Sequence, residues 1–385
     1  MMKLKSCLLV LFLILVPAFL SAQSLHSPTW GFSLDLPPGY EFVEGNAFDR
    51  FSFEGPSGAM FDMLVYNGVF PDVADMIQHI NRRLGNRGDV SFFDYGGRAA
   101  AILELDFAGF EGWALGLELE SAEEWGSPPL LMALAYAPVG TENVDLLHIS
   151  ALNSIVPTPA DARRPGPIME FAFPRGDLVE MPLAGDLGLS AMFRENDAYA
   201  AQMLIDQEFL VLTLYQFSPY WQEAWIRFYR AIHRDSWDRV ADAAFQIERY
   251  LNRGGVAGIR GDPGEINREF AQRALAFVQG FYYERDFDGS DFINLVTAVT
   301  EGRGDCDSRA MLWAMILAQA NIPAAIMVSR HYSHAMGLAD VPGTGARFEA
   351  GGVRWLVAET TSSVDIGLIA AHKSTIENWL GVLFE

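Results

Sequence analysis

Hydrophobic and polar residues alternate with period two in several short stretches of the first 157 residues, a pattern typical of half-buried β-strands. One strand is predicted over residues 30–36, because the alternation there stops at Pro37-Pro38-Gly39, a turn signal. A helix is predicted over residues 73–84, where apolar residues recur every three or four positions. This part is therefore expected to be β-rich, with further strands at 51–53, 60–66, 99–107, 113–119 and 130–136.

The pattern changes after a proline-rich junction at residues 157–167. Strands are predicted over 187–193 and 207–216, followed by a long helical region over 220–251 with a candidate break at 235–236. Several arginines of that region fall mostly opposite its apolar residues, so we expect a solvated basic face there, made by Arg227, Arg230, Arg234 and Arg239. The alternative is a surface for an acidic partner.

Glycine-rich residues 254–264 lead into a third pattern. Helices are predicted over 265–281 and 292–299 and from Cys306 to about 321, with strands at 324–328, 334–339 and 353–361. Together these patterns predict the α+β class. They divide the chain into a leader, a β-rich N-terminal domain, a small α+β middle domain and a C-terminal α+β domain, at residues 1–22, 23–157, 158–262 and 263–385.

The leader has the composition of a secretory signal peptide. Lys3 and Lys5 precede an apolar run at residues 8–16, and small residues end at Ala22, where cleavage is expected. The run is shorter than the ~20 residues that a membrane-spanning helix needs. Cys7 precedes the run, a poor position for lipid attachment. We therefore expect a secreted or periplasmic protein without stable membrane insertion; an uncleaved N-terminal anchor is the alternative.

The charge balance excludes nucleic acids as partners. The 385 residues carry 27 lysines and arginines against 49 acids, a net charge of −22, and removal of the two leader lysines makes it −24. Such an acidic surface repels the phosphates of nucleic acids and anionic lipids. Half of the residues are hydrophobic and 20% are charged, as in a folded protein.

Cysteine usage singles out one residue. Removal of the leader leaves Cys306 alone, so no internal disulfide can form, and this thiol is either buried and inert or present for its reactivity. It follows Gly302 and Gly304, which allow a tight turn, and it begins the predicted helix. The positive end of that helix would lower the thiol pKa, and the Cys306 backbone N–H could donate to an oxyanion. The neighbouring Asp305 and Asp307 act against this unless they point outward.

A histidine and an acid further along the chain could serve as the base and the orienting group for a Cys306 nucleophile. His334, on a predicted strand, would take the thiol proton and later protonate a leaving amine. Glu359, on another strand, would hold the imidazole in the required tautomer. His331 is the alternative base or a metal ligand, and an inert Cys306 and an ordinary strand acid at Glu359 are the plain alternatives. We expect no metal and no cofactor.

Residues 265–367 resemble the transglutaminase-like superfamily, relatives of papain-type cysteine proteases. The matching pieces are 277–279 with Tyr282-Tyr283, Gly304-Asp305-Cys306-Asp307, 321–323, His334-Ala335-Met336-Gly337, and Trp355 with Glu359-Thr360-Thr361. The resemblance implies a papain-like fold, with Cys306 as nucleophile, His334 as base and Glu359 as third member. The family more often has Asp at the last position. Gln279 or Tyr282 would supply a second oxyanion donor.

These observations lead to one expected chemistry, acyl transfer through a Cys306 thioester at an amide bond of a peptide or protein. With water as acceptor the protein would be a cysteine peptidase or amidase, which is the first expectation. With a lysine amine as acceptor it would be a cross-linking transglutaminase. The competing class is a non-catalytic protein whose N-terminal domain binds a cell-envelope partner.

Overall fold

The computed structural model describes residues 24–46, 48–120, 127–185, 187–253, 262–285 and 289–384. It is mixed α+β, 38% helical and 28% strand, with a large antiparallel sheet, so the predicted class is confirmed. The expected signal peptide lies outside the described residues. Within them, no helix has both the length and the apolar composition needed to cross a membrane.

Seven antiparallel strands form the larger sheet, in the order β3-β4-β5-β9-β8-β7-β6. A separate two-stranded pair joins β1 (Leu25–His26) to β2 (Ser33–Leu34), so the strand expected over 30–36 is only two residues long. The expected strand over 60–66 matches β5. The bounds are β3 (Glu41–Gly45), β4 (Arg50–Glu54), β5 (Met60–Tyr66), β6 (Val90–Tyr95), β7 (Arg98–Phe107), β8 (Phe110–Glu118) and β9 (Leu130–Pro138).

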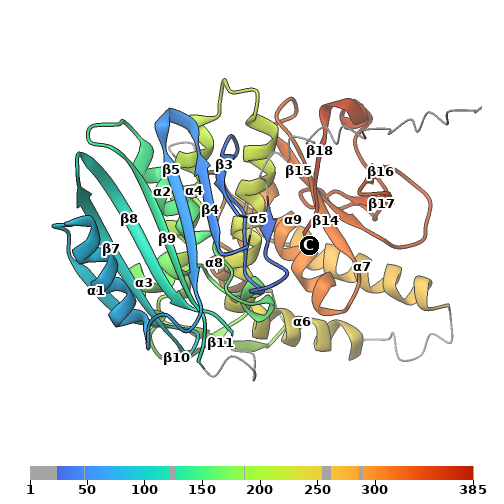
Figure 1. Ribbon diagram of the computed structural model, residues 1–385. Coiled ribbons are helices and arrows are strands. Elements are labelled where there is room, and N and C mark those ends of the chain that lie inside the picture. Colours follow the sequence, from blue (N-terminus) through green and yellow to red (C-terminus); the bar gives the residue numbers. More distant parts are fainter. Residues whose placement is uncertain are drawn as a thin grey trace, which may run out of the picture.

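Helices cover both faces of this sheet (Figure 1). α1 (Val73–Leu84) has the predicted bounds: the Asp72 side chain caps its start, and Gly85, at φ 62°, ends it. It packs on one face, while α2 (Val144–Asn153), α4 (Asp197–Leu214) and the start of α5 (Trp221–Arg239) pack on the other. In β5, β7, β8 and β9 alternate residues contribute to the two cores, as the period-two pattern requires.

Two expectations for the middle of the chain are wrong. Residues 207–216 were expected to form a strand, but most of them belong to α4. Ile205 packs into one hydrophobic cluster and Val211 into another, so apolar residues surround this helix and hide its periodicity. The long helix breaks at Val240, between α5 and α6 (Ala241–Arg253), rather than at 235–236. α3 (Pro167–Ala172) and the hairpin of β10 (Leu178–Pro182) and β11 (Ser190–Arg194) precede α4.

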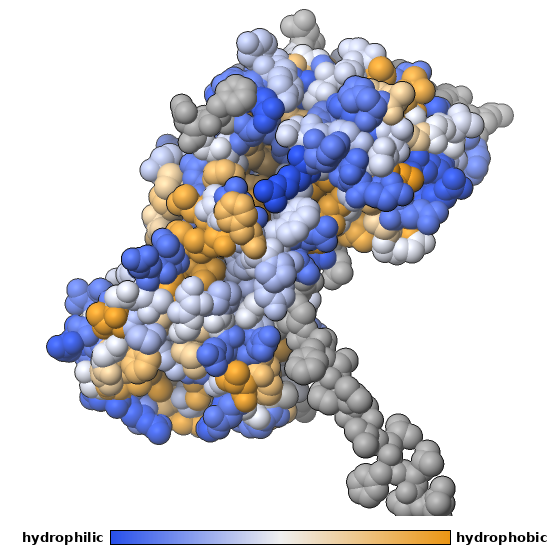
Figure 2. Space-filling view, turned by 90° about the horizontal axis from the view of Figure 1, so that it is seen from above, coloured by the Kyte–Doolittle hydropathy of each residue, from blue (hydrophilic) through white to orange (hydrophobic). Residues whose placement is uncertain are grey.

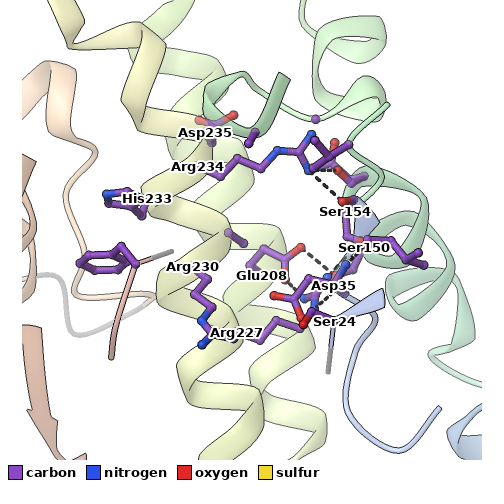
Figure 3. A pocket seen from close by; sticks show the side chains of 17 residues that line it. Ser24, Asp35, Ser150, Ser154, Glu208, Arg227, Arg230, His233, Arg234 and Asp235 are labelled. Carbon is purple, nitrogen blue, oxygen red and sulfur yellow. Dashed lines mark hydrogen bonds and ion pairs between the residues drawn. The ribbon is translucent and has the colours of Figure 1, made fainter. Parts of the chain in front are cut away.

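The expected solvated arginine face of α5 is also wrong. Arg227 is 5% exposed, binds Glu208 of α4 at 2.7 Å and donates to the Asp35 carbonyl at 2.8 Å (Figure 3). Arg234 donates to the carbonyls of Asn153 and Ser154, which end α2. Because a carbonyl at a helix C-terminus lacks an intrahelical partner, a guanidinium is well suited to satisfy it. These contacts fix α5 against the N-terminal part of the chain.

The C-terminal part contains a five-stranded antiparallel sheet in the order β16-β17-β15-β14-β18. α9 (Cys306–Gln319) packs on one face of it, and Trp313 is so close to the sheet that a Cβ on Gly337 would lie 2.3 Å from its ring. The other described elements here are α7 (Pro263–Gln279), β12 (Tyr282–Tyr283), α8 (Leu295–Glu301), β13 (Arg303–Gly304), β14 (Ala324–Ser329), β15 (His334–Ala339), β16 (Arg347–Ala350), β17 (Val353–Ala358) and β18 (Leu380–Val382).

The helices between the two sheets share cores with both. One hydrophobic cluster joins residues of α5 and α6 to α7, α9 and the five-stranded sheet, and a second joins the seven-stranded sheet to α4 and α5. α5 therefore lies between the sheets and contacts both sides (Figure 1). Figure 2 shows hydrophobic residues gathered near the middle of one face of the molecule, with mostly hydrophilic residues toward its ends. The expected domain boundaries stay predictions.

Candidate active site

Cys306 is the first residue of α9, as predicted. The Asp305 side chain caps the helix, with Oδ1 accepting the Ser308 backbone N–H at 2.8 Å. Just before it, Gly302 at φ 66° ends α8, and β13 then pairs with β12 in parallel. This turn buries the thiol, which is 3% exposed.

Three groups contact the Cys306 sulfur. The thiol donates to Asp307 Oδ2 at 3.5 Å, the Ala335 backbone N–H donates to the sulfur, and the Tyr283 side chain hydrogen-bonds it. Burial and then the charges of Asp307 and Asp305 raise the thiol pKa well above its ordinary value, and the Ala335 N–H opposes this in part. Burial and the flanking acids therefore act together against the effect expected of the helix terminus, and the thiol is protonated at neutral pH.

Asp305 and Asp307 form a carboxyl pair around the cysteine. Asp305 is fully buried, its Oδ2 accepts no hydrogen bond, and burial followed by the nearby Asp307 raises its pKa well above the usual range. A proton on Asp305 that is shared with Asp307 accounts for both observations. The other oxygen of Asp307 accepts the hydroxyl of Tyr229, on α5, at 2.6 Å.

These residues also have the spacing of a metal site. Ligand atoms of Asp305, Cys306 and Asp307 lie within 4.8 Å of one another, the one such group among the described residues. The positive end of α9 points at the same place and disfavours a cation.

His334 and Glu359 lie at neighbouring ends of β15 and β17, which pair antiparallel. The His334 Nε2 lies 2.9 Å from Oε2 and 3.1 Å from Oε1 of Glu359, which also accepts from the Thr361 backbone at 2.9 Å and Lys373 at 3.2 Å. Burial raises the pKa of Glu359, but the hydrogen bonds from His334 and Thr361 outweigh burial and lower it to about 2. Glu359 is thus an ionised acceptor, and Nδ1 is the imidazole nitrogen left for a substrate or the thiol.

The structure brings the cysteine to the end of the strand that carries the histidine. Ala335, which contacts the sulfur, directly follows His334. In the described part of the chain the hydrogen bond of the thiol goes to Asp307 and that of the imidazole to Glu359, with no bond between Cys306 and His334. His331, the alternative base, is exposed, and its ring packs on Tyr332 with centroids 4.7 Å apart.

The two expected oxyanion donors have other positions. The Gln279 amide donates to the carbonyls of Glu359 and Val364, both at 2.9 Å, so it holds the backbone of the acid. Tyr282 is 73% exposed. The side chain at the sulfur belongs to its neighbour Tyr283, which sequence reasoning placed in the motif without a role. Burial and then Cys306 raise the pKa of Tyr283, so its hydroxyl keeps its proton.

Sequence reasoning also missed two basic residues. The buried Arg309 donates to the carbonyls of Gly304 at 3.1 Å and Phe281 at 2.6 Å, and its head lies 5.3 Å from the centroid of the Tyr283 ring. It therefore ties the first turn of α9 to β12 and β13. Lys373 reaches Glu359 from a 3₁₀ turn outside the resemblance. Arg309 lies about one helical turn after Cys306, and this spacing could have pointed to it. No sequence pattern pointed to Lys373.

Comparisons with known proteins identify no family. No family model matches this chain, and no curated protein does. A structure from Bacteroides thetaiotaomicron VPI-5482 is 11% identical, with 57% of this chain and 80% of that chain covered and a TM-score of 0.25. A candidate protease from Parabacteroides distasonis ATCC 8503 is 9% identical, with 81% and 69% covered and a TM-score of 0.22.

Proposed function

We propose that this protein transfers acyl groups from peptide or protein amides through a thioester at Cys306, with hydrolysis as the main outcome. The observation that carries the proposal is the position of His334. It is paired with Glu359 at the start of β15, and the next residue of that strand, Ala335, donates its backbone N–H to the Cys306 sulfur. A nucleophile at a helix start, a base beside it and an ionised group that orients the base are the parts of thiol-dependent acyl transfer.

The proposed reaction needs only Cys306, His334, the amide substrate and water. His334 Nδ1 takes the thiol proton as the sulfur attacks the amide carbon, and the same proton passes to the leaving amine when the C–N bond breaks. Water then attacks the thioester, again with His334 as base, and releases the acid and the free thiol. Because the Cys306 thiol is neutral at rest, its proton leaves during the attack. In that step the Cys306 thiol gives up its hydrogen bond to Asp307 and forms one with His334.

Two donors would stabilise the negative oxygen that forms on the carbonyl. The Cys306 backbone N–H lies in the first turn of α9, where no intrahelical acceptor is available. The Tyr283 hydroxyl is the second, because it lies at the sulfur and keeps its proton. Gln279 and Arg309 position this machinery through the backbone.

A product analysis tests the proposal. The protein, with Cys306→Ala as its control, is incubated with a peptide mixture in ¹⁸O-labelled water, with and without a primary alkylamine. Peptide products with ¹⁸O in the new carboxylate, made by the cysteine protein alone, are the expected result. Amine-capped products that replace the acids would assign the cross-linking reaction instead. Equal product formation by Cys306→Ala would reject the nucleophile.

A non-catalytic role is the second candidate, and the surroundings of the Cys306 thiol favour it. The thiol is 3% exposed, has a raised pKa and bonds Asp307 rather than His334. In that case the fold is a scaffold, and the N-terminal sheet binds a cell-envelope partner after secretion. Absence of any Cys306-dependent product in the same experiment supports this alternative. Secretion itself is proposed from the sequence of residues 1–22.

A further inference from the structure

One helix outside the C-terminal domain carries an aromatic row that reaches the nucleophile. Along α5, Trp221 and Trp225 have ring centroids 6.0 Å apart, and Trp225 and Tyr229 are 6.3 Å apart. The spacing of four residues places all three on one face of the helix. At one end the Tyr229 hydroxyl binds Asp307, and at the other Trp221 lies 5.7 Å from the Arg330 head.

A cavity lies on each side of Trp225. The first, of about 270 Å³, is bounded by Asp307, which contacts the Cys306 sulfur. The second, of about 350 Å³, is bounded by Trp379, whose ring centroid is 6.2 Å from that of His334. One cavity therefore shares a wall residue, Asp307, with the surroundings of the nucleophile, and the other shares Trp379 with those of the base.

The chemistry assigns the two cavities to the two parts of a substrate. The histidine gives its proton to the leaving amine, so the leaving part lies on the side of His334. The acyl part, which stays on sulfur, lies on the side of Cys306. The cavity beside Asp307 is therefore the acyl-side cavity.

We propose that this acyl-side cavity is a specificity pocket for a large apolar side chain, aromatic or branched aliphatic, in the acyl part of the substrate. Its walls are mainly apolar side chains from α4, α5 and the segment before α8: Phe209, Leu212, Trp225, Phe228, Tyr229 and Phe292. The nearby acids are already engaged, Asp291 by Arg285 and Asp307 by Tyr229. Among the described residues the cavity wall contains no lysine, arginine or histidine, so an acidic substrate residue would lose its hydration without gaining a partner there.

This inference rests on the proposed function and gives the middle segment a role that the sequence did not reveal. α4 and α5 would select the substrate, while the C-terminal domain performs the chemistry. Because Arg227 and Arg234 anchor α5 to the N-terminal part, the pocket walls are fixed in position. Preorganised walls select side chains more sharply than mobile ones do.

The test compares peptide substrates that differ only in the two residues on the acyl side of the scissile bond. Phe, Leu, Ala and Asp are placed there in turn, and kcat/KM is measured for the full chain, for Phe209→Ala and for Leu210→Ala. Leu210 is the matched control, since it neighbours Phe209 but is 50% exposed and lies outside the cavity wall. The rate of iodoacetamide labelling of Cys306 measures the reactivity of the thiol independently of peptide turnover.

The expected result is a preference for Phe or Leu over Ala and Asp of about tenfold or more, the usual discrimination of an apolar pocket. Phe209→Ala reduces that ratio, and Leu210→Ala keeps it. Turnover without preference, or a ratio unchanged in Phe209→Ala, overturns the pocket and leaves the acyl-transfer proposal standing. No turnover of any peptide, with labelling unaffected by His334→Ala, overturns the proposed function and the pocket with it.

Discussion

The Tyr229 hydroxyl donates to Asp307 Oδ1 at 2.6 Å, while Oδ2 of the same carboxylate accepts the Cys306 thiol at 3.5 Å. A residue of α5 thereby reaches the candidate nucleophile through one carboxylate. Burial and then Asp307 raise the pKa of Tyr229 well above the ordinary value, so the hydroxyl remains a donor. The bond holds the carboxylate against the thiol, which keeps the thiol neutral.

Asp307→Asn is expected to make Cys306 more reactive at neutral pH. The substitution removes a negative charge next to the sulfur, so the thiol pKa falls and the pH profile of iodoacetamide labelling moves to lower pH. Glu349→Gln, at a side chain that is 82% exposed, is the control for a lost surface charge. A profile that stays in place in Asp307→Asn would show that burial alone sets the thiol pKa.

Tyr283→Phe is expected to slow acyl transfer by about 10²–10³ in kcat, the usual effect of losing one oxyanion donor. KM for the same peptide should change little, because the ring and its packing on Arg309 remain. Tyr282→Phe removes an exposed hydroxyl on the adjacent residue and should leave kcat unchanged. Equal effects of the two substitutions would remove Tyr283 from the mechanism.

Glu359 should contribute to stability in a defined pH window. Its pKa is lowered from 4.5 to about 2, so its contribution is present above pH 4.5 and is lost as the pH falls toward 2. The full contribution is roughly 3 kcal/mol. Glu359→Gln should therefore flatten the dependence of the unfolding free energy on pH between those values, as measured by urea denaturation. An acid dependence as steep as that of the unsubstituted chain contradicts the assignment.

Gly337→Ala is expected to destabilise the C-terminal sheet by about 1–3 kcal/mol. A methyl group there would lie 2.3 Å from the ring of Trp313, a residue of α9 that is fully buried against the sheet. Gly280→Ala is the control, because its φ is −74° and the nearest atom to an added methyl is 3.3 Å away. Urea midpoints decide the question, and equal midpoints for the two variants would mean that α9 moves away at little cost.

The sequence predicted what local patterns determine. The helix over 73–84 and the strand over 334–339 have the predicted bounds, since clear periodicity and end signals fix them. α4 was mistaken for a strand, because two cores share its apolar residues. Arg234 of α5 looked solvated, because its acceptors include the backbone carbonyls of Asn153 and Ser154, which are 81 and 80 positions away in the chain.

The candidate site was predictable only in part. A thiol at a helix start, a histidine and an acid could be selected by residue type and order. Their surroundings depend on tertiary contacts: Tyr229 and Lys373 come from segments without any motif. The direction of the thiol pKa shift follows from the burial of Cys306 and from the nearby Asp307 and Asp305, neither of which spacing determines. The role of Cys306 and His334 as a reacting pair remains a prediction.

The most direct test of the central claim is to trap the acyl-enzyme. The protein is mixed with an activated ester of an N-acyl phenylalanine, quenched in acid and analysed by intact mass spectrometry, beside Cys306→Ala, His334→Ala and His331→Ala. The account predicts one acyl group on Cys306 that forms and turns over within the assay. His331→Ala should behave alike, Cys306→Ala should gain no acyl group, and His334→Ala should acylate and deacylate about 10²–10⁴ times more slowly. Acylation that is indifferent to His334, or that persists in Cys306→Ala, would contradict it.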